Sequence, residues 1–239
     1  MEKEPKFYQE EPNERGVDPE RNPVVYSFED NLGSLEVIYE KDSENYNNIV
    51  RIKGSTGEWF EINSLLPKVY SIDFRKRYDS FFEAVTDART HFDPDRKEIT
   101  LTQREAETEG WKYLIAILHE VGHVVIARDQ SEKFIKLDAL YKRQKNLDIE
   151  QQKQMLALSS ENERSAWAFA IRQLRNITKE LGMPIKEIFS DSKELMDYIN
   201  KKLMTYKSGA MTYDKFLNYG GLASEIEKLY VHDRKKGKK

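Results

Sequence analysis

One apolar run, YLIAILHEVGHVVIA from Tyr113 to Ala127, constrains the fold of this chain more than any other stretch. Twelve of its fifteen residues are apolar or glycine, and the other three are His119, Glu120 and His123. Its length and composition predict a helix that is buried in the core. Burying two imidazoles and a carboxylate is costly unless these groups are paired or bound to a cation. The run therefore predicts a polar centre inside the hydrophobic interior.

The spacing of the three ionisable groups favours metal binding. His119 and His123 are four residues apart, so both imidazoles project from the same side of a helix. Glu120 directly follows the first histidine, which gives the pattern HExxH. In this pattern the histidines bind zinc and the glutamate acts as a general base. Gly122 lies between the ligands, where a helical glycine costs about 1 kcal/mol relative to alanine, so we expect another backbone or a substrate to approach it closely.

A catalytic zinc site needs a third protein ligand, and two glutamates compete for this position. They lie in the segment SSENERSAWAFAIRQL, residues 159–174. Glu163 falls in an apolar stripe at helical spacing, whereas Glu161 lies about 200° round the helix with Arg164 and Ser165. We therefore predict Glu163 as the ligand and Glu161 as a solvent-facing residue. The stripe around Glu163 consists of Leu156, Ala166, Trp167, Ala170, Leu174 and Ile177.

The first part of the chain predicts a sheet. Four short β-prone runs are separated by the turn-rich segments DNLG, DSENYNN and GSTG, which is typical of an antiparallel meander. The runs are residues 24–28, 35–40, 49–53 and 58–62. Phe74 then begins a helical apolar pattern that ends at Ala88, and this predicts an amphipathic helix lying on the sheet.

The second part predicts one more strand followed by helices. The turn HFDPDRK precedes an edge strand, Glu98 to Thr102, which feeds the HExxH helix through a T-x-x-E capping box at Thr102 and Glu105. That helix should continue to about Arg128. Strands followed by helices give an α+β fold class. Further helices are expected at residues 148–181, which Gly182 and Pro184 close, after a cap formed by Asp191 and Glu194, and in shorter pieces over 213–230, which Gly220 and Gly221 break.

We divide the chain into an arm at 1–22, one domain at 23–232 and a basic tail at 233–239. Within the domain, residues 23–70 are strand-rich, 71–181 form the core and 182–232 are helical. The chain has no cysteine, so a metal must be held by His, Asp or Glu. A charged start and the lack of a membrane-length apolar run predict a soluble, cytoplasmic protein. The net charge of -3 gives no reason to expect nucleic acid as a partner.

HEVGH, followed by Glu163, Ala166, Phe169 and Ala170 in the pattern E-x-x-A-x-x-F-A, resembles the ImmA/IrrE family of gluzincin-type zinc metallopeptidases. The resemblance covers about residues 74–180. It implies a zincin-like core with the HExxH helix behind an edge strand. It also implies an intracellular protein as substrate, in many members a transcriptional repressor. The separation between His123 and Glu163 is longer than in the family, and the N-terminal strands have no counterpart there.

On this basis we expect a zinc-dependent endopeptidase in which His119, His123 and Glu163 bind Zn2+ and Glu120 is the general base. The strand at 98–102 would hold an extended substrate by backbone pairing. Trp111 and Trp167 are interpreted as core residues, and the donor to the oxyanion is left open among thirteen tyrosines and two further histidines, His91 and His232.

Two other functions remain open. A zinc-binding regulatory or scaffold module without catalysis would bind metal with no role for Glu120. An adaptor that binds through its basic tail would show strongly salt-dependent association. Neither explains a glutamate directly after the first histidine. The oligomeric state is not predicted.

Overall fold

The computed structural model describes residues 24–40, 47–75, 90–203 and 222–236. The predicted arm at 1–22 lies outside these residues, as does nearly all of the helix that was predicted from Phe74 to Ala88. Residues 204–221 and the last three residues are also outside them.

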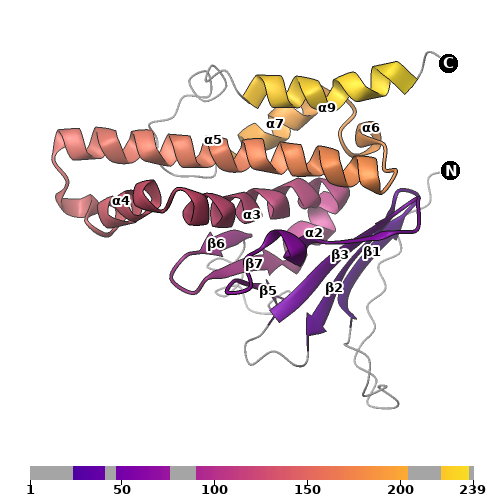
Figure 1. The fold of residues 1–239 in the computed structure, drawn as a ribbon, viewed down its shortest axis with the longest axis horizontal. Helices are drawn as coiled ribbons and strands as arrows, with labels where there is room; N and C mark the ends of the chain where they lie inside the picture. Colours follow the sequence, from indigo (N-terminus) through magenta and orange to yellow (C-terminus); the bar gives the residue numbers. More distant parts are fainter. Residues whose placement is uncertain (1–23, 41–46, 76–89, 204–221, 237–239) are drawn as a thin grey trace.

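The N-terminal strands form a four-stranded antiparallel sheet, as predicted (Figure 1). Leu35 and Val37 alternate along one strand and pair with Ile52 and Val50 of the next, and all four are buried. This period of two places one face of the sheet against the core. The strands are β1 (Val24–Asp30), β2 (Gly33–Glu40), β3 (Asn47–Gly54) and β4 (Trp59–Glu61), joined in the order β1-β2-β3-β4.

A second, three-stranded sheet corrects two expectations. It contains β5 (Ser71–Arg75), β6 (His91–Asp93) and β7 (Glu98–Thr102) in the order β5-β7-β6. Phe74 is therefore in a strand and does not begin a helix. β7 is the central strand, parallel to β5 and antiparallel to β6, so it is not an edge strand. Its residues 99–102 are buried on both faces, as in a central strand, and β6 occupies the edge within the described part of the chain.

The predicted HExxH helix is interrupted. Helix α2 (Gln103–Glu109) ends at Gly110, whose φ of 52° favours glycine, and a 3-10 turn (Gly110–Lys112) leads into α3 (Tyr113–Asp129). The predicted capping box is also absent, because the Thr102 side chain makes no cap hydrogen bond. Instead Glu105 Oε2 accepts a hydrogen bond from the Thr90 N–H at 2.6 Å. The Glu105 carboxylate thus links α2 to the backbone at Thr90 and does not cap its own helix.

The later helices largely follow the sequence. Helix α5 (Ile149–Glu180) begins with a capping box formed by Asp148 and Gln151 and is followed by Gly182 with a φ of 67°. Asp191 Oδ1 accepts from the Glu194 N–H at 2.9 Å, which confirms the predicted cap. Helix α4 (Ser131–Lys142) was not predicted, and residues 222–236 form one helix, α9 (Leu222–Lys236). The remaining α-helices of the described residues are α6 (Ile185–Ile188) and α7 (Ser192–Leu203).

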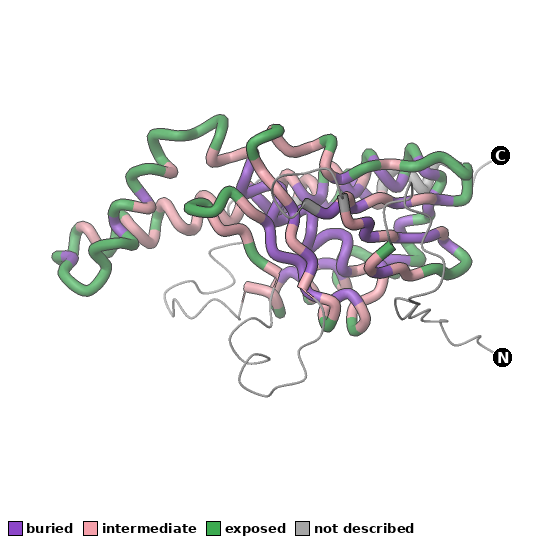
Figure 2. Tube along the Cα trace, turned by 90° about the horizontal axis from the view of Figure 1, so that it is seen from below, coloured by how far each residue is buried: buried purple, intermediate pink, exposed green. Residues whose placement is uncertain are grey.

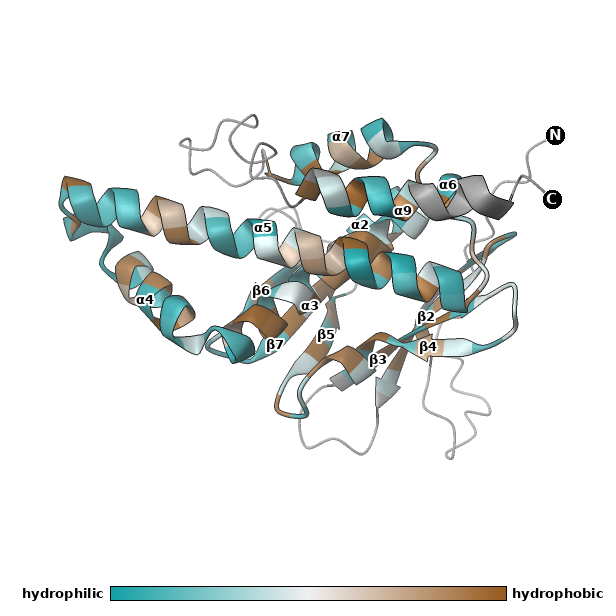
Figure 3. Cartoon of the chain, turned by 45° about the horizontal axis from the view of Figure 1, so that its top comes forward, coloured by the Kyte–Doolittle hydropathy of each residue, from teal (hydrophilic) through white to brown (hydrophobic). Residues whose placement is uncertain are grey.

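Helix α3 lies at the centre of the molecule. Figure 1 shows it between the strands and the long helix α5, while α9 packs on α5, and α7 contacts α9 and α2. The buried residues gather around this centre, and the far end of the α4–α5 hairpin is mostly exposed (Figure 2). Along α5, hydrophilic and hydrophobic residues alternate (Figure 3), as expected of a helix with one buried face. Among the described helices, none has the length and apolarity needed to cross a membrane.

Candidate metal centre

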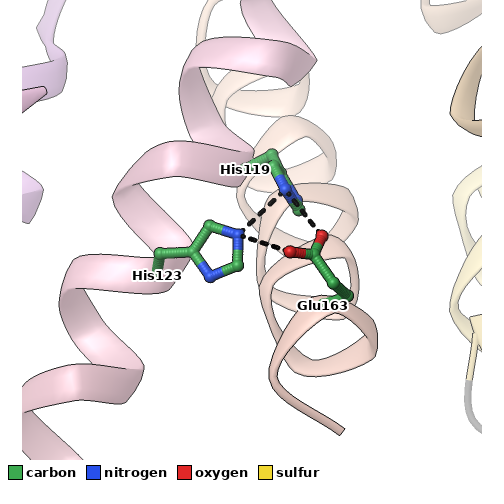
Figure 4. Close-up of side chains that lie close together, drawn as sticks. All are labelled: His119, His123 and Glu163. Carbon is green, nitrogen blue, oxygen red and sulfur yellow. Dashed lines mark hydrogen bonds and ion pairs between the residues drawn. The ribbon is translucent and has the colours of Figure 1, made fainter. Parts of the chain in front are cut away.

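Helices α3 and α5 bring three side chains to one point. His119 and His123 project from α3, and Glu163 projects from α5 toward them (Figure 4). The two Nε2 atoms are 3.0 Å apart, His119 Nε2 is 3.3 Å from Glu163 Oε2, and His123 Nε2 is 3.5 Å from Glu163 Oε1. A tetrahedral cation with bonds of about 2.1 Å separates its ligand atoms by about 3.4 Å. The spacing of the three groups therefore fits one metal ion.

Gly122 explains why the two helices come close enough. A Cβ atom at this position would lie 2.8 Å from the Ala166 carbonyl oxygen and 2.9 Å from the Ala166 Cα. The expected close approach of another backbone is confirmed, and that backbone belongs to α5. Because Ala166 is three residues after Glu163, the contact at Gly122 brings the Glu163 carboxylate within reach of the histidines.

The burial of the site favours neutral imidazoles. Burial, helped by the Lys202 charge, lowers the pKa of His119 to about 3. Burial also lowers the pKa of His123 to about 4, against the opposing effect of Glu163. At neutral pH both rings are therefore uncharged, and their contacts with Glu163 are not ion pairs. Neutral imidazoles with free lone pairs are the form that binds metals.

Glu163 carries the strongest indication that a cation belongs here. Its side chain is 13% exposed, and burial raises the pKa of its carboxyl group while His123 lowers it. Within the described part of the chain, Glu163 Oε2 has no hydrogen-bond partner. A buried carboxylate whose two oxygens face two imidazole lone pairs is unfavourable by itself. A divalent cation between the three groups would compensate all of them.

Two further side chains orient the histidines. Trp167 is buried and stacks on His119 with ring centroids 4.1 Å apart, which confirms it as a core residue. Asn162 Nδ2 lies 3.1 Å from His123 Nδ1, while Asn162 Oδ1 lacks a partner within the described residues. With the amide oxygen and nitrogen of Asn162 exchanged, the oxygen lies 3.1 Å from His123 Nδ1. His123 Nδ1–H then donates to Oδ1, which leaves the Nε2 lone pair directed at Glu163.

Glu120 is held beside the three ligands. It is 6% exposed, and its Oε2 accepts a hydrogen bond from the Phe92 N–H of β6 at 2.9 Å. Burial, followed by the Glu163 charge, raises the pKa of Glu120 well above the ordinary value. Glu120 lines two cavities, of about 240 and 220 Å3, and His91 lines both as well. The carboxylate can therefore meet a molecule that enters either cavity.

The structure separates the remaining candidates from the site. Glu161 is half-buried and turns toward α4, where it binds Lys133 Nζ at 2.5 Å, so Glu163 and not Glu161 lies with the histidines. Trp111 is a core residue as predicted, but its contacts are with Phe28 and Asp30 of β1. His91 lies in β6, outside the group of three.

Sequence reasoning missed a charged cluster beside the site. Lys202 of α7 lies 2.9 Å from Glu105 Oε1 and 2.8 Å from Glu109 Oε1 of α2. All three side chains line the larger cavity together with His119 and Glu120. Glu105 and Glu109 are four residues apart, which shows that they share one helix face. No local pattern indicates that Lys202, almost a hundred residues later, joins them.

Comparisons with models of known protein families, with curated proteins and with solved structures gave no match. The interpretation of the site therefore depends on the geometry of this chain.

Proposed function

We propose that this chain is a zinc-dependent peptidase that hydrolyses peptide bonds of a protein substrate. The observation that carries the proposal is the convergence of His119, His123 and Glu163 on one point, beside a fourth group, Glu120, that opens into the same cavity. Two histidines and one glutamate with an open position are the donor set of catalytic zinc. The ImmA/IrrE resemblance adds a cytoplasmic regulatory protein, such as a transcriptional repressor, as the class of substrate.

Each of these residues has its own role in the proposed reaction. His119, His123 and Glu163 would hold zinc, which supplies a Lewis acid that polarises the scissile carbonyl and makes water more acidic. Glu120 takes a proton from the attacking water and transfers it to the leaving amine. The Phe92 N–H holds one oxygen of the Glu120 carboxylate, so the other oxygen can receive the proton. In this proposal α3, lying against the β5-β7-β6 sheet, corresponds to the zincin-like core.

The expected strand at 98–102 has no part in binding the substrate. β7 is paired with β5 over residues 98–102 and with β6 over residues 98–100, so neither of its sides is open to an added strand. The edge that faces the site belongs to β6.

The test compares variants of the purified, zinc-loaded protein. Glu120→Gln should retain zinc and lose cleavage of an unfolded protein substrate, because the amide cannot accept the proton. His119→Ala should lose zinc as well, whereas Glu161→Gln, at a residue that turns toward α4, should change neither property. Zinc content is measured by mass spectrometry and cleavage by peptide release. Full cleavage by Glu120→Gln would refute the general-base role, and zinc binding without cleavage by the unaltered protein would favour a scaffold module.

A further inference from the structure

The two cavities that meet at Glu120 differ in character. The larger cavity is lined by the charged groups of α2 and α7 described above. The smaller one contains Glu120, His123 and Glu163 and extends between β6 and α4. A peptide that passes Glu120 therefore meets a charged wall on one side and a largely apolar wall on the other. The apolar part of this lining consists of Phe92, Pro94, Phe134, Leu137 and Tyr141, and Asp138, which pairs with Lys142, lines the cavity as well.

The edge of β6 has its outward N–H donors already occupied. The Thr90 N–H donates to Glu105 at 2.6 Å and the Phe92 N–H donates to Glu120 at 2.9 Å. These residues are two apart, so both N–H groups point away from β7. The next position on this side is Pro94, which has no N–H. Over residues 90–94, the outward N–H donors are therefore either used by the protein or lacking, so this edge offers a substrate backbone only its carbonyl groups, and side-chain contacts add to the selection.

Helix α4 supplies the side chains for such contacts. Phe134, Leu137 and Tyr141 follow one another at spacings of three and four residues, which places them on one face of the helix. The Phe134 ring lies 6.5 Å from the Phe92 ring, so the aromatic surface continues from α4 to β6. The Tyr141 hydroxyl donates to Ser159 Oγ at 2.9 Å, which fixes this face of α4 to α5.

We propose that the cavity between β6 and α4 is a specificity subsite that takes a bulky apolar side chain, leucine or phenylalanine, next to the bond that is cut. The inference rests on the proposed peptidase function. The cavity of about 220 Å3 corresponds to about seven water molecules at about 30 Å3 each, so it has room for one large side chain. An apolar pocket of this kind discriminates between side chains by about ten- to a hundredfold.

The experiment uses a host peptide of alanine and serine with one guest residue: phenylalanine, leucine, aspartate or glycine. Cleavage by the zinc-loaded protein is followed by mass spectrometry, and binding of the same peptides to Glu120→Gln is measured by fluorescence anisotropy. Leu137→Asp places a charge in the subsite, and Phe134→Ala removes part of its wall without a charge. Ile135→Asp is the matched control, since Ile135 lies on the same helix and is 65% exposed. Melting temperatures show which variants are folded.

We expect phenylalanine and leucine to be preferred about ten- to a hundredfold at one fixed position relative to the cut. Leu137→Asp should abolish this preference, Phe134→Ala should reduce it, and Ile135→Asp should retain it. Cleavage without a guest preference would overturn the subsite and leave the peptidase intact. A guest preference in binding that depends on Leu137, without cleavage, would support the subsite and refute the peptidase. If the peptides were neither bound nor cleaved, both the subsite and the peptidase function would be refuted.

Discussion

Replacing Gly122 by alanine tests how the two ligand-bearing helices are held together. The new Cβ would lie 2.9 Å from the Ala166 Cα, whereas carbon atoms in favourable contact are about 3.5–4.0 Å apart. The backbones of α3 and α5 must then separate locally by at least about 0.6 Å. Metal sites tolerate changes of only about 0.2 Å in ligand distances. We therefore expect zinc affinity to fall by at least about tenfold, as for changes in the groups that orient metal ligands.

The substitution has two opposing effects on stability. Alanine improves helix propensity by about 1 kcal/mol, while forcing a methyl group between packed backbones costs about 1–3 kcal/mol. The free energy of unfolding of the metal-free protein should thus decrease by about 0–2 kcal/mol. It is measured by urea denaturation, and zinc affinity is measured by competition with a chromophoric chelator.

Gly57→Ala is the matched control for this prediction. Gly57 has a φ of 81° and nothing within 4 Å of the position of its Cβ, so alanine there introduces backbone strain without a clash. This variant should lose about 1–2 kcal/mol of stability and keep its zinc affinity. If Gly122→Ala bound zinc normally and were about 1 kcal/mol more stable, the close approach of α3 to α5 could not be what positions the ligands.

Three further outcomes follow from the described contacts. Adding zinc at a thousand times its dissociation constant should stabilise the protein by about 4 kcal/mol, and a chelator should reverse the gain in a thermal melt. Glu163→Gln should lower zinc affinity at least about tenfold in a calorimetric titration, while Glu161→Gln should not. Lys202→Met should cost the metal-free protein up to about 3 kcal/mol at pH 7, because it leaves Glu105 and Glu109 without their cation. Burial raises the pKa of Glu105, but the Lys202 pairing outweighs it and the net pKa lies below 4.5. Stability from this pair is therefore present above pH 4.5 and lost as the pH falls through the lowered pKa. The difference between Lys202→Met and the unaltered protein should narrow over that range in acid denaturation curves.

The three candidate metal ligands were predictable because helical periodicity determines them. A spacing of four places His119 and His123 on one side of any helix. The apolar stripe around Glu163 likewise distinguishes it from Glu161 without knowledge of the tertiary structure. Helical periodicity gives no information about the distance between α3 and α5. That distance depends on the contact between Gly122 and Ala166.

The strand order could not be predicted in the same way. β5 and β7 are parallel and are separated by more than twenty residues in the sequence. No local sequence pattern predicts such a pairing. Phe74 matched a helical repeat by its spacing, but pairing with Leu101 of β7 places it in a strand. The hydrogen bond from Phe92 to Glu120 depends on this strand order as well. By contrast, the apolar spacing of Phe134 and Leu137 is a local signal that indicates α4.

The most direct test of the metal centre is anomalous scattering from a crystal of the zinc-loaded protein, measured on both sides of the zinc absorption edge. The geometry predicts a single strong peak within bonding distance of His119 Nε2, His123 Nε2 and a Glu163 carboxylate oxygen. A zinc-loaded crystal with no peak between these atoms, or with the peak bound by other side chains, would contradict the account.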